Sequence, residues 1–158
     1  MRVGIVGAEG AKFSRKAEGD AKRLILSLLQ PDDVVVSGGC HLGGIDLWAE
    51  QAARHLNLPA PIIHRPVTRS WASGYKPRNL LIAQDADVLH NIVVDAYPDG
   101  WDGMTFPFCY HCGKDAAHVK SGGCWTAKQA QRLGKPAHWH VVRNHAGPSV
   151  GLAIPIRF

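Results

Sequence analysis

The sequence predicts a Rossmann-like α/β domain, with a parallel sheet of about five strands, helices on both faces and a loop inserted before the last helix. Short runs rich in valine and isoleucine alternate along the chain with longer stretches of helical spacing. Such alternation favours a parallel sheet, because each crossover returns the chain to the same edge. The length of 158 residues and the 46% apolar composition suffice for one sizeable core, so we expect residues 1–158 to form a single domain.

The expected strands are short apolar runs of the kind that is buried on both faces of a sheet. In chain order they are Arg2–Val6, Asp33–Val36, Ala60–His64, Val88–Val94 and His138–Val142. The tail that follows has no clear pattern, although Leu152–Ile156 is a candidate edge strand.

Four stretches between these strands have helical spacing and helix-ending signals. They are residues 17–28 with Ser14 as the cap, 45–56, 78–86 and about 124–133. The segment 96–123 interrupts the alternation, because it is long, rich in glycine, proline and aromatic residues, and contains two of the four cysteines. We therefore expect an inserted loop there.

Charge and hydropathy limit the partners and the location of the protein. A formal net charge of +5 and a pI near 9.2 favour anionic partners, either nucleic acid or small phosphorylated ligands. The basic residues are scattered, so a solvated basic surface explains the charge equally well. No apolar stretch approaches membrane-spanning length and no signal-peptide pattern is present. We expect a cytoplasmic protein with no membrane partner, and a homo-oligomer is possible.

Two glycine-rich stretches are expected at the same edge of the sheet. "SGGCHLGGID" follows the second strand and "SGGCW" precedes the last helix. Ligands of open parallel sheets bind beyond the carboxyl ends of the strands. Glycine lets a phosphate approach backbone N–H groups, and a helix start favours negative charge. The two stretches therefore predict a phosphate site, and tight turns with close helix–strand packing are the alternative explanation.

Further candidate residues lie near these stretches. Gly7, in "VGAEGAK" after the first strand, would let a ligand approach, and Gly44 and His41 belong to the first glycine-rich stretch. In "GYKPRN", a proline precedes Arg78 and Asn79 at an expected helix start. There an arginine can bind phosphate bidentately and an asparagine can contact a sugar hydroxyl or cap the helix; an exposed arginine beside a plain cap is the alternative.

The inserted loop contains a pattern typical of structural zinc sites. Cys109 and Cys112 form a Cys-x-x-Cys-Gly knuckle, and His118 and Cys124 complete a Cys3His set suited to tetrahedral Zn²⁺. A redox dithiol and unconnected buried thiols are the alternatives, and Cys40 is the rival fourth ligand. A structural zinc would fix the loop over the ligand site and offset the entropy of ordering it.

The order and spacing of three segments resemble a known superfamily. "VVVSGGCHLGGIDLWAEQAA", "KPRNLLIAQDADVL" and "SGGCWTAKQAQRLGKPAHWHVV" resemble the SLOG superfamily, shared by the DNA-processing A (Smf) proteins and the LOG-type lysine-decarboxylase-like proteins. The small stand-alone YspA-like members of bacteria and phages are the most similar branch. The resemblance implies a Rossmann-like fold that binds nucleotides or nucleotide-derived ligands, as a sensor, a sequestering protein or an enzyme. The matching positions are Ser37, Gly38, Gly39, Gly43, Asp46, Arg78, Asn79, Ser121, Gly122, Gly123 and Thr126.

Two other activities follow from the same resemblance. LOG-type phosphoribohydrolases cleave the N-glycosidic bond of nucleoside monophosphates, but Gln129 stands here where that family has its catalytic glutamate. An amide supplies neither the negative charge nor the proton transfer of that mechanism, and Asp46 or Glu50 would have to substitute. DNA-processing A proteins bind single-stranded DNA, for which Trp71, Tyr75 and Trp125 are candidate stacking residues.

Overall fold

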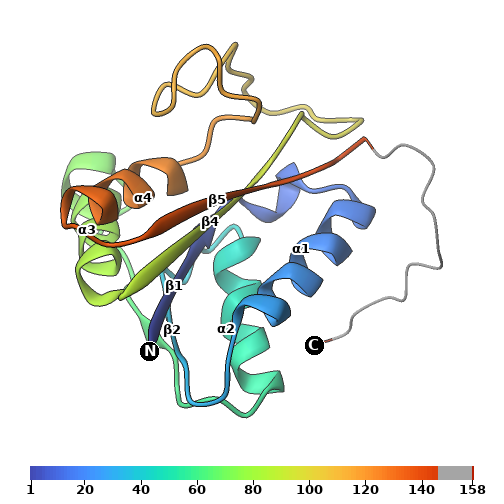
Figure 1. The fold of residues 1–158 in the computed structure, drawn as a ribbon. Helices are drawn as coiled ribbons and strands as arrows, with labels where there is room; N and C mark the ends of the chain where they lie inside the picture. The colour runs from blue at the N-terminus through green and yellow to red at the C-terminus, as the bar shows by residue number, and fades with distance from the viewer. Residues whose placement is uncertain (146–157) are drawn as a thin grey trace.

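A five-stranded parallel sheet forms the centre of the molecule (Figure 1). The computed structural model describes residues 1–145 and 158, so the candidate strand Leu152–Ile156 lies outside the described residues. The strand order is β3-β2-β1-β4-β5, and all neighbouring strands are parallel. The strands are β1 (Arg2–Gly7), β2 (Val34–Ser37), β3 (Ile62–Ile63), β4 (Val88–Val94) and β5 (Ala137–Val142). The predicted Rossmann-like α/β class is confirmed.

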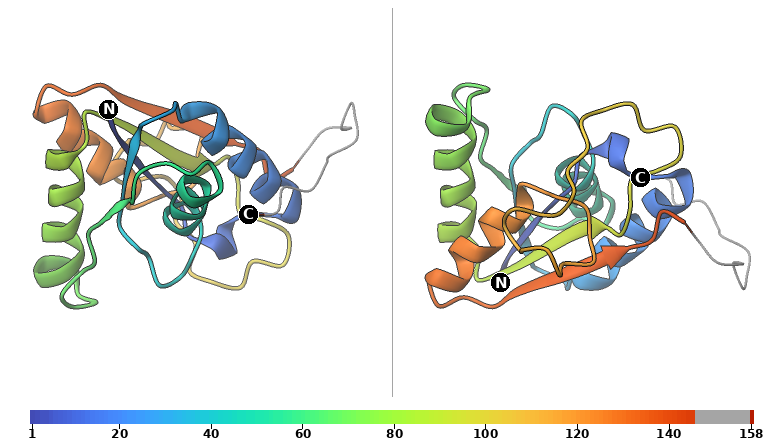
Figure 2. Two further views of the ribbon diagram at one scale, coloured as in Figure 1. Left: turned by 90° about the horizontal axis from the view of Figure 1, so that it is seen from below. Right: turned by 90° about the horizontal axis from the view of Figure 1, so that it is seen from above.

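Helices cover both faces of this sheet (Figure 1, Figure 2). One face packs against α1 (Arg15–Leu28) and α2 (Ile45–His55), and the other packs against α3 (Lys76–Asp85) and α4 (Gly123–Arg132). On β1, Val3 and Ile5 belong to the first core and Val6 belongs to the second. Successive side chains of a strand point to opposite faces, which explains why the central strands read as unbroken apolar runs.

The start of α1 follows the predicted pattern. The Ser14 hydroxyl accepts a hydrogen bond from the Ala17 N–H at 3.1 Å, which caps the helix. Ala17, Ala21 and Ile25 are fully buried on the inner face. Such a cap contributes about 1 kcal/mol to stability. Beyond the end of β5, the Asn144 side chain donates to the carbonyl groups of Lys12 and Ala96, so the segment that follows β5 is attached to the loop that follows β1.

Two element boundaries differ from the prediction. The strand expected at Ala60–His64 is reduced to Ile62–Ile63, because prolines at positions 59 and 61 lack the N–H that a strand ladder uses. The third helix begins at Lys76 rather than at Arg78, and a π-helical turn, Trp71–Tyr75, precedes it. Proline is accepted in the first turn of a helix, so Pro77 does not delay the start.

Three histidines lie together at the β5 side of the sheet. His90 Nδ1 is 3.0 Å from His140 Nε2, and the rings of His90 and His138 stack with centroids 5.3 Å apart. Burial, together with the neighbouring His140 and His138, lowers the pKa of His90 to about 4. These residues pack against each other across β4 and the edge strand β5, and none of them lines the pocket described below.

The inserted loop leaves the end of β4 and lies beyond the carboxyl ends of the strands (Figure 1). It returns to the sheet where the Val119 N–H donates to the Val94 carbonyl at 2.8 Å. The loop therefore stands next to the edge at which both glycine-rich stretches were expected. Within the described part of the chain, no helix combines the length and the apolar character needed to cross a membrane.

Candidate ligand pocket and metal cluster

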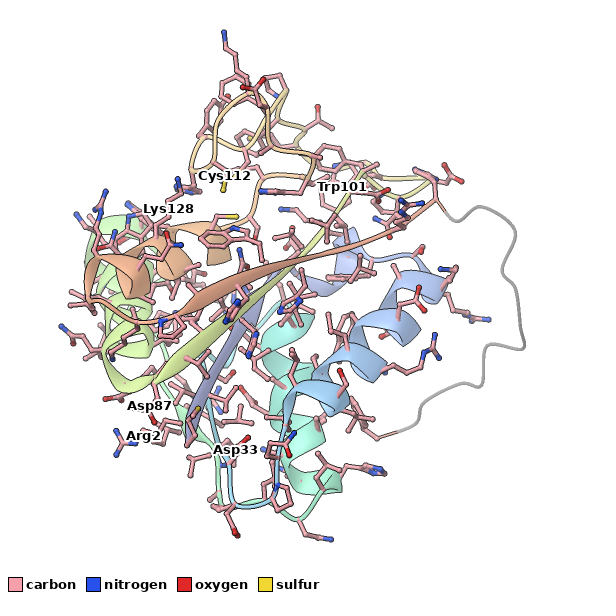
Figure 3. All side chains as sticks on the ribbon, in the orientation of Figure 1. Arg2, Asp33, Asp87, Trp101, Cys112 and Lys128 are labelled. Atoms are coloured by element: carbon pink, nitrogen blue, oxygen red, sulfur yellow. The ribbon has the colours of Figure 1, made fainter. Side chains whose placement is uncertain are left out.

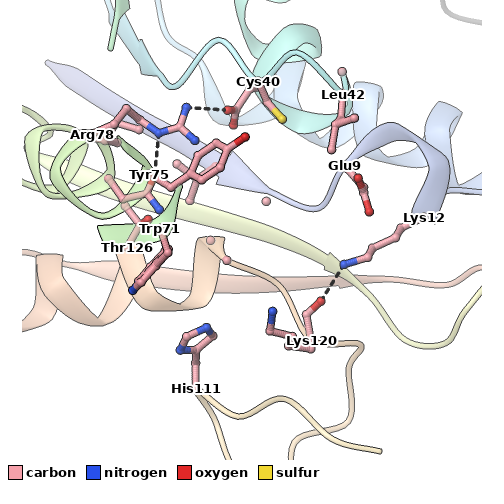
Figure 4. Close-up of a pocket in the computed structure, with 18 of the residues that line it drawn as sticks. Glu9, Lys12, Cys40, Leu42, Trp71, Tyr75, Arg78, His111, Lys120 and Thr126 are labelled. Atoms are coloured by element: carbon pink, nitrogen blue, oxygen red, sulfur yellow. Dashed lines mark hydrogen bonds and ion pairs between the residues drawn. The ribbon is translucent and has the colours of Figure 1, made fainter. Parts of the chain in front are cut away.

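A pocket of about 620 Å³ lies at the carboxyl edge of the sheet (Figure 4). Its walls come from the loop after β1, the loop between β2 and α2, the π-helical turn with α3, the inserted loop and the start of α4. The predicted ligand residues that line it are Gly7, Gly43, Asp46, Arg78, Asn79, Gly122, Gly123 and Thr126. The predicted residues outside its lining are Ser37, Gly38, Gly39, His41, Gly44 and Ser121.

The first glycine-rich loop, residues 38–44, is fixed mainly by contacts within the protein. Gly44 has a positive φ of 81°, and a Cβ there would lie 2.5 Å from the Ala8 carbonyl oxygen. Only glycine satisfies both conditions. The amide of Gly43 donates to the Cys40 carbonyl at 3.1 Å, so this N–H already has an acceptor. At this loop, part of the glycine content therefore serves close packing of backbone on backbone.

Arg78 lines the pocket and also supports this loop. It is only 7% exposed. Its Nε donates to Asn79 Oδ1 at 2.7 Å, its Nη1 donates to the Gly38 carbonyl, and Nη1 lies 3.9 Å from the Asp46 carboxylate. Figure 4 shows the guanidinium turned toward the loop that carries Cys40. The arginine thus holds α3 and the first glycine-rich loop together.

The carboxyl group of Asp46 lines the same pocket in a buried position. Burial raises the pKa of Asp46 to about 6, with Arg78 acting to lower it and Glu50 acting to raise it. Glu50 lies outside the pocket lining and accepts a hydrogen bond from the Ser37 hydroxyl at 2.8 Å. Of the two carboxylates that could replace the glutamate of the hydrolase motif, Asp46 is therefore the one that reaches the pocket.

The second glycine-rich loop, residues 121–123, packs against the end of β1. A Cβ at Gly123 would lie 2.4 Å from Asn91 Oδ1 and 3.1 Å from the Gly7 Cα. The Gly123 amide donates to the Ser121 hydroxyl at 3.2 Å. Over residues 1–145 and 158, the amide of Gly122 has no acceptor, and this residue lines the pocket.

Several pocket residues were not identified from the sequence. Lys12 and Lys120 line one end, and the Lys12 ammonium donates to the Lys120 carbonyl at 3.0 Å. Burial, with a contribution from the Lys120 charge, lowers the pKa of Lys12, while Glu9 acts in the opposite direction. Tyr110 and His111 enter the lining from the inserted loop. Lys12 ends "VGAEGAK" and Lys120 precedes "SGG", so position beside a glycine stretch was the signal that could have identified both lysines.

The four predicted metal ligands come together in the inserted loop and at the start of α4. The ligand atoms of Cys109, Cys112, His118 and Cys124 all lie within 4.8 Å of one another. Figure 3 shows Cys112 on the loop above α4. Cys40 is a pocket residue and is not part of this cluster. Three thiols with one imidazole are a ligand set that fits tetrahedral zinc, and the cluster could hold a metal ion.

The surroundings of Cys124 are built for a buried sulfur. Asn91 Nδ2 donates to Cys124 Sγ at 3.2 Å, and Cys124 is fully buried. Burial and the charge of Cys109 raise the pKa of Cys124 to about 12, so a metal bound there would displace a proton. Cys124 directly follows Gly123, and the cluster therefore adjoins the second glycine-rich loop.

The fold and the site define a Rossmann-like α/β protein with a pocket at the carboxyl edge of its sheet and a Cys3His cluster beside it. No protein-family model matches the sequence, and no curated protein matches it. Among solved structures, a molybdenum cofactor carrier protein from Chlamydomonas reinhardtii is similar, with a TM-score of 0.49 and 14% identity. The alignment covers 87% of this chain and 74% of that one.

Proposed function

We propose that this protein binds a nucleotide or a nucleotide-derived phosphorylated molecule in the pocket at the carboxyl edge of the sheet. The observation that supports this most is the composition of the lining. Residues from both glycine-rich stretches and from the Arg78–Asn79 segment meet in one pocket, although the sequence separates them by up to 80 positions or so. The resemblance to the SLOG superfamily points to the same class of ligand.

The proposal includes a structural zinc at Cys109, Cys112, His118 and Cys124. Four protein ligands fill a tetrahedral coordination sphere, which leaves no open position for a reacting water. The zinc would order the segment that supplies Tyr110, His111 and Lys120 to the pocket wall. Its role in this proposal is to build the pocket, and the ligand binds beside it.

Thermal unfolding in the presence of candidate ligands tests the binding. Nucleoside monophosphates, ADP-ribose and cyclic nucleotides form the panel, and a ligand at 100 times its Kd raises the free energy of unfolding by about 2.7 kcal/mol. We expect at least one to raise Tm, and we expect Arg78→Ala to weaken that effect. No response from any compound would overturn the proposal. Affinity that grows with oligonucleotide length and falls steeply with salt would instead indicate single-stranded DNA binding.

The position of Asp46 favours hydrolysis of the N-glycosidic bond as a second candidate function. A carboxyl group with a pKa of about 6 inside a pocket has the properties of a general acid or base near neutral pH. Gln129, at the position of the family glutamate, is not part of the pocket lining. Mass spectrometry after long incubation with AMP or GMP would detect released base, and Asp46→Asn should abolish that release. Intact substrate would eliminate this function and leave the binding proposal standing.

A further inference from the structure

The pocket has two chemically different ends (Figure 4). Trp71 and Tyr75 line the end next to α3, and Lys12 and Lys120 line the opposite end, between the loop after β1 and the inserted loop. The first end offers aromatic surface and the second offers two ammonium groups. A ligand that satisfies both ends must itself have a planar apolar part and an anionic part.

Among the described residues, no carboxylate lies within ion-pair distance of Lys12 or Lys120, although the charge of Glu9, which lines the same end, acts on Lys12 from farther away. The Lys12 ammonium contacts the Lys120 carbonyl at 3.0 Å, and the Lys120 ammonium lies 4.5 Å from the Phe106 ring centroid. Two partly buried cations at one end of a pocket repel each other, and an anion between them would relieve this repulsion.

Arg78, the cation that the sequence favoured for phosphate binding, is engaged elsewhere. Its guanidinium bonds to the Gly38 carbonyl and to Asn79, and it lies beside Asp46. Through these contacts Arg78 holds the first glycine-rich loop in place. The charge that is available to a ligand therefore stands at the lysine end, across the pocket from Arg78.

The aromatic end is suited to a flat ring system. Trp71 is 44% exposed and packs edge-on against Trp125, with ring centroids 5.3 Å apart. Tyr75 lies with its ring 5.5 Å from the Arg78 guanidinium. Both rings are thus fixed by neighbours while they border the pocket, and fixed aromatic faces are the surfaces on which nucleobases stack.

We infer that the pocket binds a nucleoside phosphate in one orientation, with the phosphate between Lys12 and Lys120, the base against Trp71 and Tyr75, and Arg78 acting as a positioning residue for the Gly38 loop. The inference rests on the proposed function and adds the orientation of the ligand, that is, which end of the pocket holds the phosphate and which holds the base. It makes the 5′-phosphate, rather than the sugar or the base, the group that the two lysines recognise.

Calorimetric titration of the zinc-loaded protein with AMP and with adenosine tests this orientation. Lys12→Met and Lys120→Met should each weaken AMP binding by about ten-fold or more, in line with hydrogen bonds to charged groups. Adenosine binding should change by less than about two-fold. Lys114→Met is the matched control, because Lys114 is exposed on the same loop and does not line the pocket, and it should leave both affinities unchanged.

Variants at the other end give the complementary pattern. Trp71→Ala and Arg78→Gln should each weaken the binding of AMP and of adenosine by the same factor. Trp71 contacts the base, which both compounds have, and Arg78 acts through the Gly38 loop. If Arg78→Gln weakens AMP and leaves adenosine unchanged, Arg78 binds the phosphate itself and the inferred orientation is wrong. The same conclusion follows if Lys12→Met and Lys120→Met leave AMP affinity within two-fold of the wild type.

Two further outcomes are distinguishable. If the wild-type protein binds neither AMP nor GMP nor any other compound of the panel, the proposed function fails as a whole. If it binds AMP but the lysine variants lose zinc, measured by metal analysis of the purified proteins, then the lysines balance the charge of the thiolate cluster and the inference of a phosphate subsite is overturned.

Discussion

The two glycine-rich loops at the carboxyl edge resemble each other in sequence, but they are held in place by different means. The loop at residues 38–44 is fixed by the protein itself, through Arg78 on the Gly38 carbonyl and through close packing of Gly44 on Ala8. The loop at residues 121–123 continues into Cys124 and so adjoins the Cys3His cluster. The first loop should therefore keep its shape without metal, whereas the second, which also packs on Gly7 and Asn91 through Gly123, should lose part of its support when the metal is absent.

The largest effect is expected from removal of a metal ligand. Loss of an outer-shell partner already costs 10- to 100-fold in metal affinity, so Cys112→Ser, which removes a ligand itself, should lower zinc affinity by more than about 100-fold. Metal analysis and a zinc titration against a competing chelator would measure this. Cys40→Ser is the control, since Cys40 is a thiol outside the cluster, and it should retain full metal content. A Cys112→Ser protein that keeps its zinc would contradict the assignment.

A large effect on stability is expected at Gly44. Alanine there combines a positive φ with a Cβ 2.5 Å from the Ala8 carbonyl, and strain plus overpacking should cost roughly 2–5 kcal/mol in the free energy of unfolding. Urea unfolding measures the change. Gly122→Ala is the matched substitution in the second loop, where a Cβ would meet no atom within 4 Å, and it should cost less than about 1 kcal/mol. Equal costs would show that neither the positive φ nor the contact with Ala8 restricts residue 44.

Arg78→Ala should loosen the first loop alone. The substitution leaves the Asp46 carboxyl and the Gly38 carbonyl without their buried partner, and we expect a loss of about 2–4 kcal/mol. Adding Asp46→Asn should recover part of the loss, because the unpaired buried charge is then gone. Zinc content should stay at the wild-type level. If the metal is lost in the Arg78→Ala protein, the two loops are not independent.

The smallest effect is a pH dependence at Asp46. Because its folded-state pKa of about 6 lies above the ordinary value of 3.8, the folded protein binds a proton more readily than the unfolded chain, so this group adds stability as pH falls from 7 toward 4. The wild type should gain about 1 kcal/mol between pH 7 and pH 5 relative to Asp46→Asn. Unfolding at both pH values measures this difference. Parallel pH profiles of the two proteins would show that Asp46 has an ordinary pKa.

Most of the fold could be predicted because its signals are local. The apolar runs of β1, β2, β4 and β5 and the Ser14 cap of α1 depend on near neighbours in the chain. The length of β3 and the π-helical turn at Trp71–Tyr75 differ from the prediction, which had a strand over Ala60–His64 and no helical turn before Arg78. Pro59 and Pro61 lack the N–H groups that a longer β3 would use. The π-helical turn has no pattern of apolar residues in the sequence that would predict it.

The candidate site was predictable only in part. Cys109 and Cys112 have the spacing of a zinc knuckle, and the cluster brings together the four residues that the sequence predicts. Arg78 supports the Gly38 loop, and Lys12 meets Lys120, only because the fold brings together segments that are far apart in the chain. Position beside a glycine stretch is the one sequence signal that these lysines carry, and it is weak because ordinary surface lysines occur there too; the structure is needed to show that both line the pocket.

The hydrogen bond from Lys12 to the Lys120 carbonyl joins residues that are 108 positions apart. During synthesis from the N-terminus, the first three strands are available long before this partner has been translated. The pocket is therefore complete only after the chain has been synthesised as far as Thr126, the last residue that lines it. Fragments that end before Cys124 should contain neither the complete pocket nor the complete Cys3His cluster.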